Sequence, residues 1–138
     1  MATISEKQHA IIEEFEDLGT WWDRYDYIIQ MGKELPPFTD NQRTDENKVS
    51  GCVSQVWIIS SFQDNLIHFQ ADSDSVFVKG LIALLMDVYS DQTPKDILNS
   101  SPEFLKTIGI MDNITPNRAN GLASMVETIK KHALNFSS

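Results

Sequence analysis

The sequence predicts an α+β domain in which a small antiparallel sheet of about three strands packs against helices. Two observations support this class. Apolar residues recur at helical spacing over most of the chain, whereas the stretch 53–71 is rich in β-branched and aromatic residues. The resulting order, helices before and after a hairpin, is typical of α+β proteins. A chain of 138 residues has the length of one domain, so we expect a single domain over residues 1–138.

Two amphipathic helices are expected at the start of the chain. Ser5 and Gln8 have the spacing of a capping box, and the helix that they open is expected to end at Gly19. Thr20 as N-cap and Asp23 three residues later mark the start of the second helix, which ends before the next prolines.

A polar segment from Phe38 to Lys48 then leads to the predicted hairpin. It has almost no apolar residues and several turn formers, so it reads as a solvated connection. The runs VWIIS and LIHFQA favour β structure, and QDN between them is turn-like. Strands are therefore predicted at about 53–61 and 66–71, with Trp57 in the core.

The remaining sequence predicts helices with well-marked starts. Asp74 is placed to cap a strongly apolar run that begins at Val76, and this helix should be largely buried. Later starts have Thr or Ser before a proline, whose missing N–H is harmless in the first helical turn. These starts are Thr93-Pro94, Ser101-Pro102 and Thr115-Pro116.

Charge and composition exclude several classes of protein. Eleven basic against 20 acidic residues give a net charge of −9, which opposes binding to the phosphate backbone of nucleic acids. No window has the roughly 20 apolar residues that span a bilayer, and no targeting segment opens the sequence. We therefore expect a cytoplasmic protein that binds neither nucleic acid nor membrane.

Cys52 is the only cysteine, and its neighbours favour a reachable thiol. A single cysteine is more often a small buried apolar residue than a reactive group. Here, however, Gly51 permits a tight turn, and small or polar residues surround the thiol directly after the polar segment. Because there is no second cysteine to resolve it, a sulfur accepted on Cys52 must pass to another molecule. This favours a relay over a self-contained redox cycle.

Several motifs resemble one known family. VSGCVSQVW is similar to the cysteine motif of the SufE family of sulfur acceptors. The resemblance continues, in the same order, through YDYIIQMGKELP, ADSDSVFVKGLIALL, LNSSPEF and ITPNRANGLASMV. It therefore covers nearly the whole chain and implies a SufE/IscU-like fold.

The resemblance also implies a function. Cys52 would receive persulfide sulfur from a SufS-type or CsdA-type cysteine desulfurase, stimulate that enzyme and pass the sulfur toward a SufBCD-like scaffold for iron-sulfur cluster assembly. No cofactor is implied beyond a transient persulfide on Cys52, and the protein acts as a transfer protein more than as a stand-alone enzyme. A monomer and a homodimer both remain open.

Further site residues are expected in a supporting or partner-binding role. Asp74, like Asp72, has a competing role as a helix cap, worth roughly 1 kcal/mol. Arg118 lies in the first turn of the last helix, where a cation opposes the helix dipole, so it is expected to face a carboxylate or an anionic sulfur. Ser54 and Gln55 are candidates to donate hydrogen bonds near the thiolate, or else to face solvent. Gly51 provides room at the thiol.

Other chemistries have weaker support. A structural zinc site needs about four organised ligands, and one cysteine with three scattered histidines does not supply them. A Cys52–His68 dyad is formally possible. A cluster scaffold of the IscU or SufU type normally uses several thiolates. The alternatives from other classes are a noncatalytic interaction module with a structural Cys52, and a thiol redox sensor.

Overall fold

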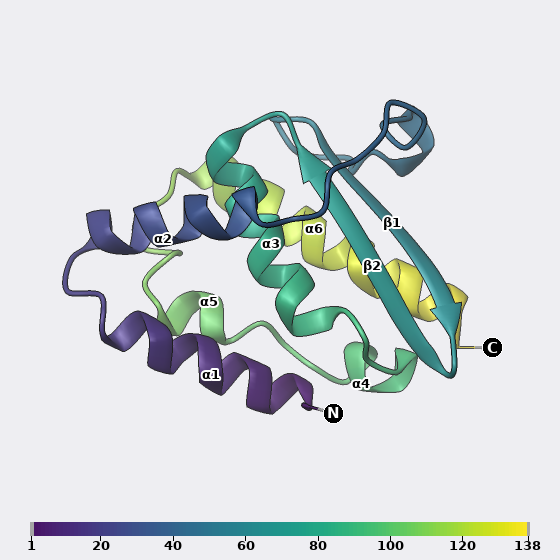
Figure 1. Cartoon of the computed structure of the whole chain (residues 1–138), viewed down its shortest axis with the longest axis horizontal. Helices are drawn as coiled ribbons and strands as arrows, with labels where there is room; N and C mark the ends of the chain where they lie inside the picture. Colours follow the sequence, from purple (N-terminus) through teal and green to yellow (C-terminus); the bar gives the residue numbers. More distant parts are fainter. Residues whose placement is uncertain (1, 138) are drawn as a thin grey trace.

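The structure is a computed structural model that describes residues 2–137 of the chain (Figure 1). It confirms the α+β class, because helices pack against a small antiparallel sheet. The elements are, in chain order, α1 (Ile4–Glu16), α2 (Trp21–Lys33), the 3-10 helix η1 (Asp45–Asn47), β1 (Val56–Gln63), β2 (Leu66–Ser73), α3 (Val76–Tyr89), α4 (Pro94–Leu98), α5 (Phe104–Thr107) and α6 (Pro116–Asn135).

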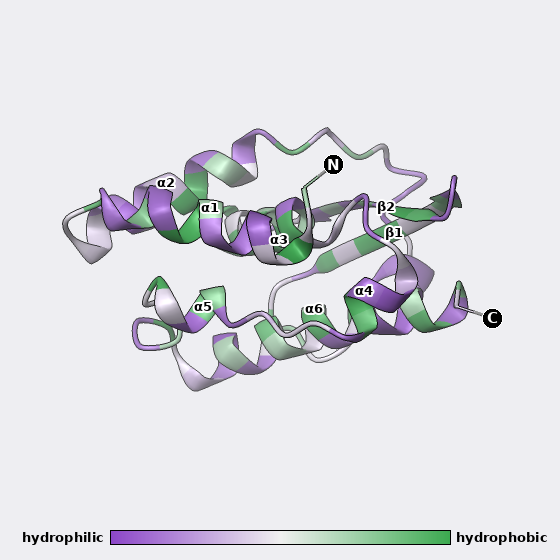
Figure 2. Ribbon diagram, turned by 90° about the horizontal axis from the view of Figure 1, so that it is seen from below, coloured by the Kyte–Doolittle hydropathy of each residue, from purple (hydrophilic) through white to green (hydrophobic). Residues whose placement is uncertain are grey.

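Helix α3 forms the centre of the molecule. Most of its 14 residues are buried, and it packs against α1, α2, α6 and β2. Figure 2 shows α1 and α2 on one side and α4, α5 and α6 on the other, with the hairpin at one end. The prediction of a largely buried helix from this apolar run is therefore confirmed, and its burial contributes to the apolar stabilisation of the fold.

The two strands form an antiparallel hairpin that is displaced from the predicted one. Strands expected at 53–61 and 66–71 lie at Val56–Gln63 and Leu66–Ser73. The hairpin turn consists of Asp64 and Asn65 alone, both with positive φ (55° and 65°), as two-residue hairpin turns of this hand require. The first strand therefore extends to the residue before the turn, and it begins later because the chain around Cys52 is a loop.

A third strand was expected, and within residues 2–137 the sheet has two strands. Isolated bridges stand on either side of the hairpin, Lys48 with Trp57 and Ile67 with Gln92. Each stops after one bridge because the flanking chain turns away, into the cysteine loop on one side and toward α4 on the other. Trp57 is buried, as predicted.

The capping box of α1 lies two residues before the predicted one. Thr3 is the N-cap and pairs with Glu6, so the prediction of Ser5 and Gln8 was wrong. Both pairs have the same spacing, and the earlier one starts the helix. The Gln8 side chain instead bonds backbone groups at the start of the α5 segment, where it joins the first helix to a distant loop.

The remaining caps are mostly as predicted. Thr20 forms its capping box. Helix α3, however, is capped by Ser75 and not by Asp74, and α5 begins at Phe104 without a side-chain cap from Ser101. The Thr-Pro starts are confirmed at Thr93-Pro94 and Thr115-Pro116.

Helices α2 and α3 cross at close range through two glycines. A Cβ on Gly80 would lie 2.3 Å from the carbonyl oxygen of Ile28, and one on Gly32 would lie 2.7 Å from the amide nitrogen of Gly80. Gly80 and Gly32 therefore allow the two helix backbones to approach closely. Figure 1 shows that the C-terminal half of α2 meets α3 at this crossing.

Candidate functional site

Cys52 lies in a short loop whose two ends are joined by backbone pairing. The Val49 amide donates to the Val56 carbonyl oxygen at 2.8 Å, and Lys48 bridges Trp57. Gly51 has φ +88°, a conformation that residues with a Cβ rarely adopt. The loop is therefore closed at its base and turns sharply at the residue before the thiol, as the small neighbours of Cys52 indicated.

The thiol is half-buried against the backbone of α6. Its Sγ lies 3.4 Å from the carbonyl oxygen of Gly121, to which the thiol donates a weak hydrogen bond. A Cβ on Gly121 would lie 3.4 Å from that sulfur, and a Cβ on Gly51 would lie 2.6 Å from the Ser124 hydroxyl. Two glycines thus allow the loop to rest directly on the helix.

A cavity of about 220 Å³ opens beside Cys52. Ser54 and Arg118, both expected near the thiol, contribute to its walls, while Asp74 and Gln55 do not. The cavity combines apolar side chains with polar groups from the first turn of α6. Its lining consists of Cys52, Val53, Ser54, Val78, Thr115, Asn117, Arg118, Gly121 and Met125.

Arg118 provides positive charge at this cavity. Its guanidinium carbon lies 5.3 Å from the centre of the Phe77 ring, a distance that permits a cation–π interaction. Among residues 2–137 no ion pair involves Arg118. The carboxylate partner considered for it is therefore not found in this part of the chain, and the charge faces the space next to the thiol.

Burial raises the pKa of the Cys52 thiol above its ordinary value. Removal of the proton would leave a charged sulfur in a partly apolar setting, so the neutral thiol is favoured. As the protein stands alone, the thiol is a weaker nucleophile at neutral pH than an exposed one, because the thiolate is the reactive form.

Alkylation of Cys52 by iodoacetamide is therefore expected to require a higher pH than alkylation of a small free thiol. The raised pKa lowers the thiolate fraction at every pH below it, so the midpoint of the rate profile moves upward. Mass spectrometry of samples quenched over a pH series measures it. In urea-unfolded protein the midpoint should return to that of the free thiol, and a folded-state midpoint at or below that of the free thiol would contradict the assignment.

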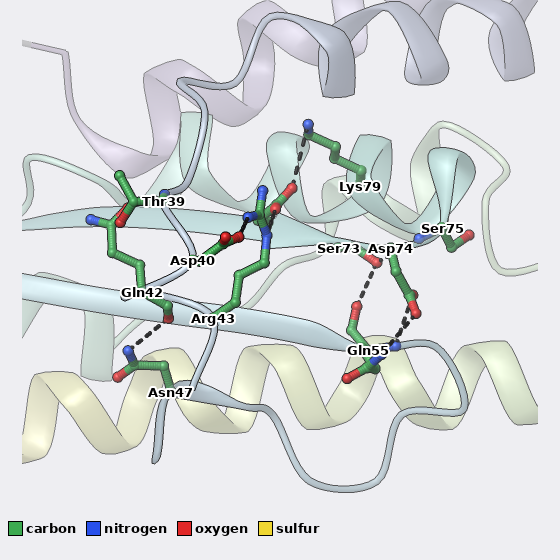
Figure 3. Close-up of polar contacts among 11 residues, drawn as sticks. Thr39, Asp40, Gln42, Arg43, Asn47, Gln55, Ser73, Asp74, Ser75 and Lys79 are labelled. Atoms are coloured by element: carbon green, nitrogen blue, oxygen red, sulfur yellow. Dashed lines mark hydrogen bonds and ion pairs between the residues drawn. The ribbon is translucent and has the colours of Figure 1, made fainter. Parts of the chain in front are cut away.

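Asp74 holds the far end of the cysteine loop. Its carboxylate accepts from the Gln55 backbone N–H at 3.0 Å and from the Gln55 side-chain amide at 3.2 Å (Figure 3). The Ser73 hydroxyl donates to the Gln55 carbonyl oxygen at 2.7 Å. Asp74 and Gln55 are thus brought together, but as a loop anchor, and the expectation that Asp74 caps α3 is wrong.

A buried carboxylate anchors the polar segment that precedes the loop. Asp72 is 5% exposed and accepts from Arg43 Nε at 2.9 Å, while Lys79 Nζ lies 3.3 Å from its other oxygen. Figure 3 shows Arg43 reaching across the hairpin to this carboxylate. Asp72 therefore does not cap α3 either. Sequence reasoning missed Arg43, because nothing in the sequence links it to a residue 29 positions away.

Arg43→Met is expected to lower the free energy of unfolding by about 2 kcal/mol. Loss of Arg43 leaves the charge of the buried Asp72 carboxylate poorly compensated. The ion pair of Asp72 with Lys79 remains and limits the loss of stability. Equilibrium urea denaturation measures the change. The matched control is Lys131→Met, which removes an ion pair whose two side chains are about 70% exposed and should cost less than about 0.5 kcal/mol. Equal effects would show that burial of Asp72 does not matter.

His68 and His132 contact polar groups away from the thiol. His68 contacts the Asp91 carboxylate, and His132 contacts the Ser60 hydroxyl. Neither lines the cavity beside Cys52, so the structure does not bring together the Cys52–His68 dyad. Over the described residues, no group of three or more His, Cys, Asp or Glu is arranged to hold a metal ion.

Several cavity residues could not be singled out from sequence. Gly121, Met125 and Val78 read as ordinary helix positions, and Thr115 reads as a cap, which it also is. The only available signal was their place in the motifs VKGL and ITPNRANGL.

Within residues 2–137, no helix has both the length and the apolar character needed to cross a membrane.

Comparisons with known proteins agree with one another. A family model described as SufE, Fe-S metabolism associated domain, matches residues 9–133. An uncharacterized SufE-like protein of Rhizobium etli is 39% identical over 128 residues, which cover 89% of this chain and 86% of the relative. An uncharacterized SufE-like protein of Synechocystis is 35% identical over 135 residues, covering 98% and 85%. The solution structure of a hypothetical protein from Thermus thermophilus has the same fold, with a TM-score of 0.76, 18% sequence identity and 94% coverage of both chains.

Proposed function

The chain belongs to the SufE family, whose domain is associated with Fe-S metabolism, and on this premise we propose that Cys52 accepts persulfide sulfur from a cysteine desulfurase. The observation that carries the proposal is the position of the only thiol, on the wall of a cavity that also holds the guanidinium of Arg118. The desulfurase would be of the SufS or CsdA type, and its turnover would rise when this acceptor is present.

The transfer step is a thiol exchange on sulfur. The Cys52 thiolate attacks the outer sulfur of the donor persulfide, a new S–S bond forms, and the S–S bond of the donor breaks. The donor cysteine leaves as a thiolate with the electron pair, and the proton of Cys52 passes to that thiolate or to water. One persulfide is consumed and one is formed, so no external oxidant or reductant is needed.

The cavity suits both the approach and the product. The outer sulfur of a persulfide on Cys52 needs space next to Sγ, and the cavity provides it. A persulfide is an anion near neutral pH, so the nearby Arg118 stabilises it. Because burial raises the thiol pKa in the free protein, the docked desulfurase would have to stabilise the thiolate with a nearby cation or provide a base that accepts the proton.

The sulfur must then leave by a second transfer. Cys52 is the only cysteine, so no internal thiol can discharge the persulfide. We infer that a downstream acceptor, a SufBCD-like scaffold for cluster assembly, takes the sulfur by the same exchange. Asp74 and Arg118 are proposed to support desulfurase docking together with the polar segment 38–48. If folded variants of both residues bind the desulfurase and stimulate its turnover as the wild type does, these residues have a structural role alone.

The test is sulfur loading measured by intact mass. The full-length protein is incubated with a purified SufS-type desulfurase and L-cysteine, then separated and weighed without reductant. The proposal expects the mass of one added sulfur atom on the protein, which disappears after treatment with dithiothreitol. An unchanged mass, under conditions in which the desulfurase turns over, would refute it.

A further inference from the structure

Three exposed apolar side chains lie on the cysteine loop and in the first turns of α2 and α3, and one of them, Val53, lines the cavity. Val53, next to the thiol, is 87% exposed, Val76 in the first turn of α3 is 59% exposed, and Trp22 in the first turn of α2 is 70% exposed. We call these three residues the apolar rim. A tryptophan with this exposure is unusual on a protein surface, because its large apolar area gains free energy when it is covered.

A continuous series of contacts joins Trp22 to the cavity. The ring of Trp22 lies 6.0 Å from that of Tyr25, which stacks on Phe77 with ring centres 4.7 Å apart. The guanidinium of Arg118 lies 5.3 Å from the Phe77 ring and reaches the cavity wall. Trp21 packs on Phe77 as well. The side chains under the rim are thus fixed by packing, which gives the exposed residues a rigid support.

The chemistry of this face indicates the kind of partner. Exposed tryptophan and arginine are the residue types that most often dominate binding energy at protein interfaces. The Arg118 charge has no ion-pair partner within residues 2–137, so it suits an anion on the occupant. A nucleic acid would need many cations, and the chain has a net charge of −9.

The transfer chemistry determines where the occupant sits. A donor on another protein must bring its persulfide within bonding distance of a half-buried sulfur, so that protein has to cover the mouth of the cavity. A stable protein interface buries about 800 Å² on each partner. A footprint of that size, centred on the cavity, extends well beyond the cysteine loop and covers neighbouring side chains.

We propose that the apolar rim is the docking face for the sulfur-donating desulfurase, whose contact surface presents apolar side chains around its persulfide anion. This inference rests on the proposed function and specifies its interface. It assigns most of the binding energy to Trp22, a residue outside the cysteine loop and the polar segment. Arg118 receives the anionic centre of the partner, and Trp22, Val53 and Val76 supply the surrounding apolar contact.

The experiment measures the affinity of a purified SufS-type desulfurase for the full-length protein by isothermal titration calorimetry. Trp22→Ala is expected to weaken binding about tenfold or more, as loss of an anchoring tryptophan does at other interfaces. The matched control is Leu134→Ala, which removes an apolar side chain that is 61% exposed near the other end of α6. It should bind within about twofold of the wild type. Circular dichroism confirms the fold of each variant.

The outcomes separate this inference from the function on which it rests. If Trp22→Ala binds the desulfurase as tightly as the wild type does, the proposed docking face is wrong and the sulfur-transfer proposal still stands. An equal loss in Leu134→Ala would also overturn the docking face, because the effect would not be local to the rim. A wild-type protein that does not bind, or is not loaded with sulfur, would overturn the proposed function and this footprint together.

Discussion

Cys52→Ser is expected to abolish desulfurase-dependent sulfur loading completely. The chain has no other thiol, and a serine hydroxyl cannot form a persulfide. The substitution replaces sulfur by oxygen at a half-buried position that contacts only one backbone oxygen by hydrogen bonding, so the fold should remain intact. Intact mass after incubation with desulfurase and L-cysteine measures the loss, and circular dichroism confirms the fold.

A relocated thiol provides the matched control. Cys52→Ser/Ser61→Cys keeps one cysteine per chain but places it on the exposed part of β1, away from the cavity. This thiol should be alkylated readily. The desulfurase should nevertheless load it with sulfur much more slowly than it loads Cys52 in the wild type. If both cysteine proteins were loaded equally, transfer would reflect thiol reactivity alone, and the cavity would have no role.

Gly80→Ala is expected to lower the free energy of unfolding by about 3 kcal/mol. The added Cβ would lie 2.3 Å from the Ile28 carbonyl oxygen, and a backbone atom inside a packed helix crossing cannot move aside cheaply. Alanine favours the helix over glycine by up to about 1 kcal/mol, which offsets only part of that cost. Since folded domains are stable by about 5–15 kcal/mol, the midpoint of urea denaturation should fall clearly.

Gly19→Ala tests whether steric contact explains the loss. Gly19 is exposed between α1 and α2, and its nearest neighbour for an added Cβ is a side-chain oxygen of Asp23 at 4.0 Å. The same methyl group should change stability there by less than about 0.5 kcal/mol. A Gly80→Ala protein as stable as this control would mean that α2 and α3 can separate without cost.

The fold could largely be predicted from sequence where the signal is local. The apolar run after Val76, the capping box at Thr20 and the Thr-Pro starts depend on residues a few positions apart, and these predictions are confirmed. Errors arose where two nearby residues offered the same chemistry. Thr3 and Ser5 both suit a cap, and the earlier pair starts the helix. Asp74 and Ser75 also both suit a cap, but Asp74 is engaged by Gln55.

The site was predictable only in part, because its contacts are long-range. The setting of Cys52 follows from its neighbours, and Ser54 and Arg118 line the same cavity, while their supporting role stays a prediction. The pairing of Arg43 with Asp72 and the contact of Cys52 with Gly121 join positions far apart in the chain, and neither follows a helical or strand period. Such contacts become visible only when the elements are packed.

The two glycines at the thiol have a consequence for how this protein can diverge. The sulfur contacts a backbone atom of the helix, the Gly121 carbonyl oxygen, while Gly51 lies close to the Ser124 side chain. A lineage could exchange the side chains that line the cavity, and with them its choice of partner, while the sulfur stayed in place. Substitution at this site is limited most at Gly51, where the positive φ and the 2.6 Å approach to the Ser124 hydroxyl disfavour any added side chain.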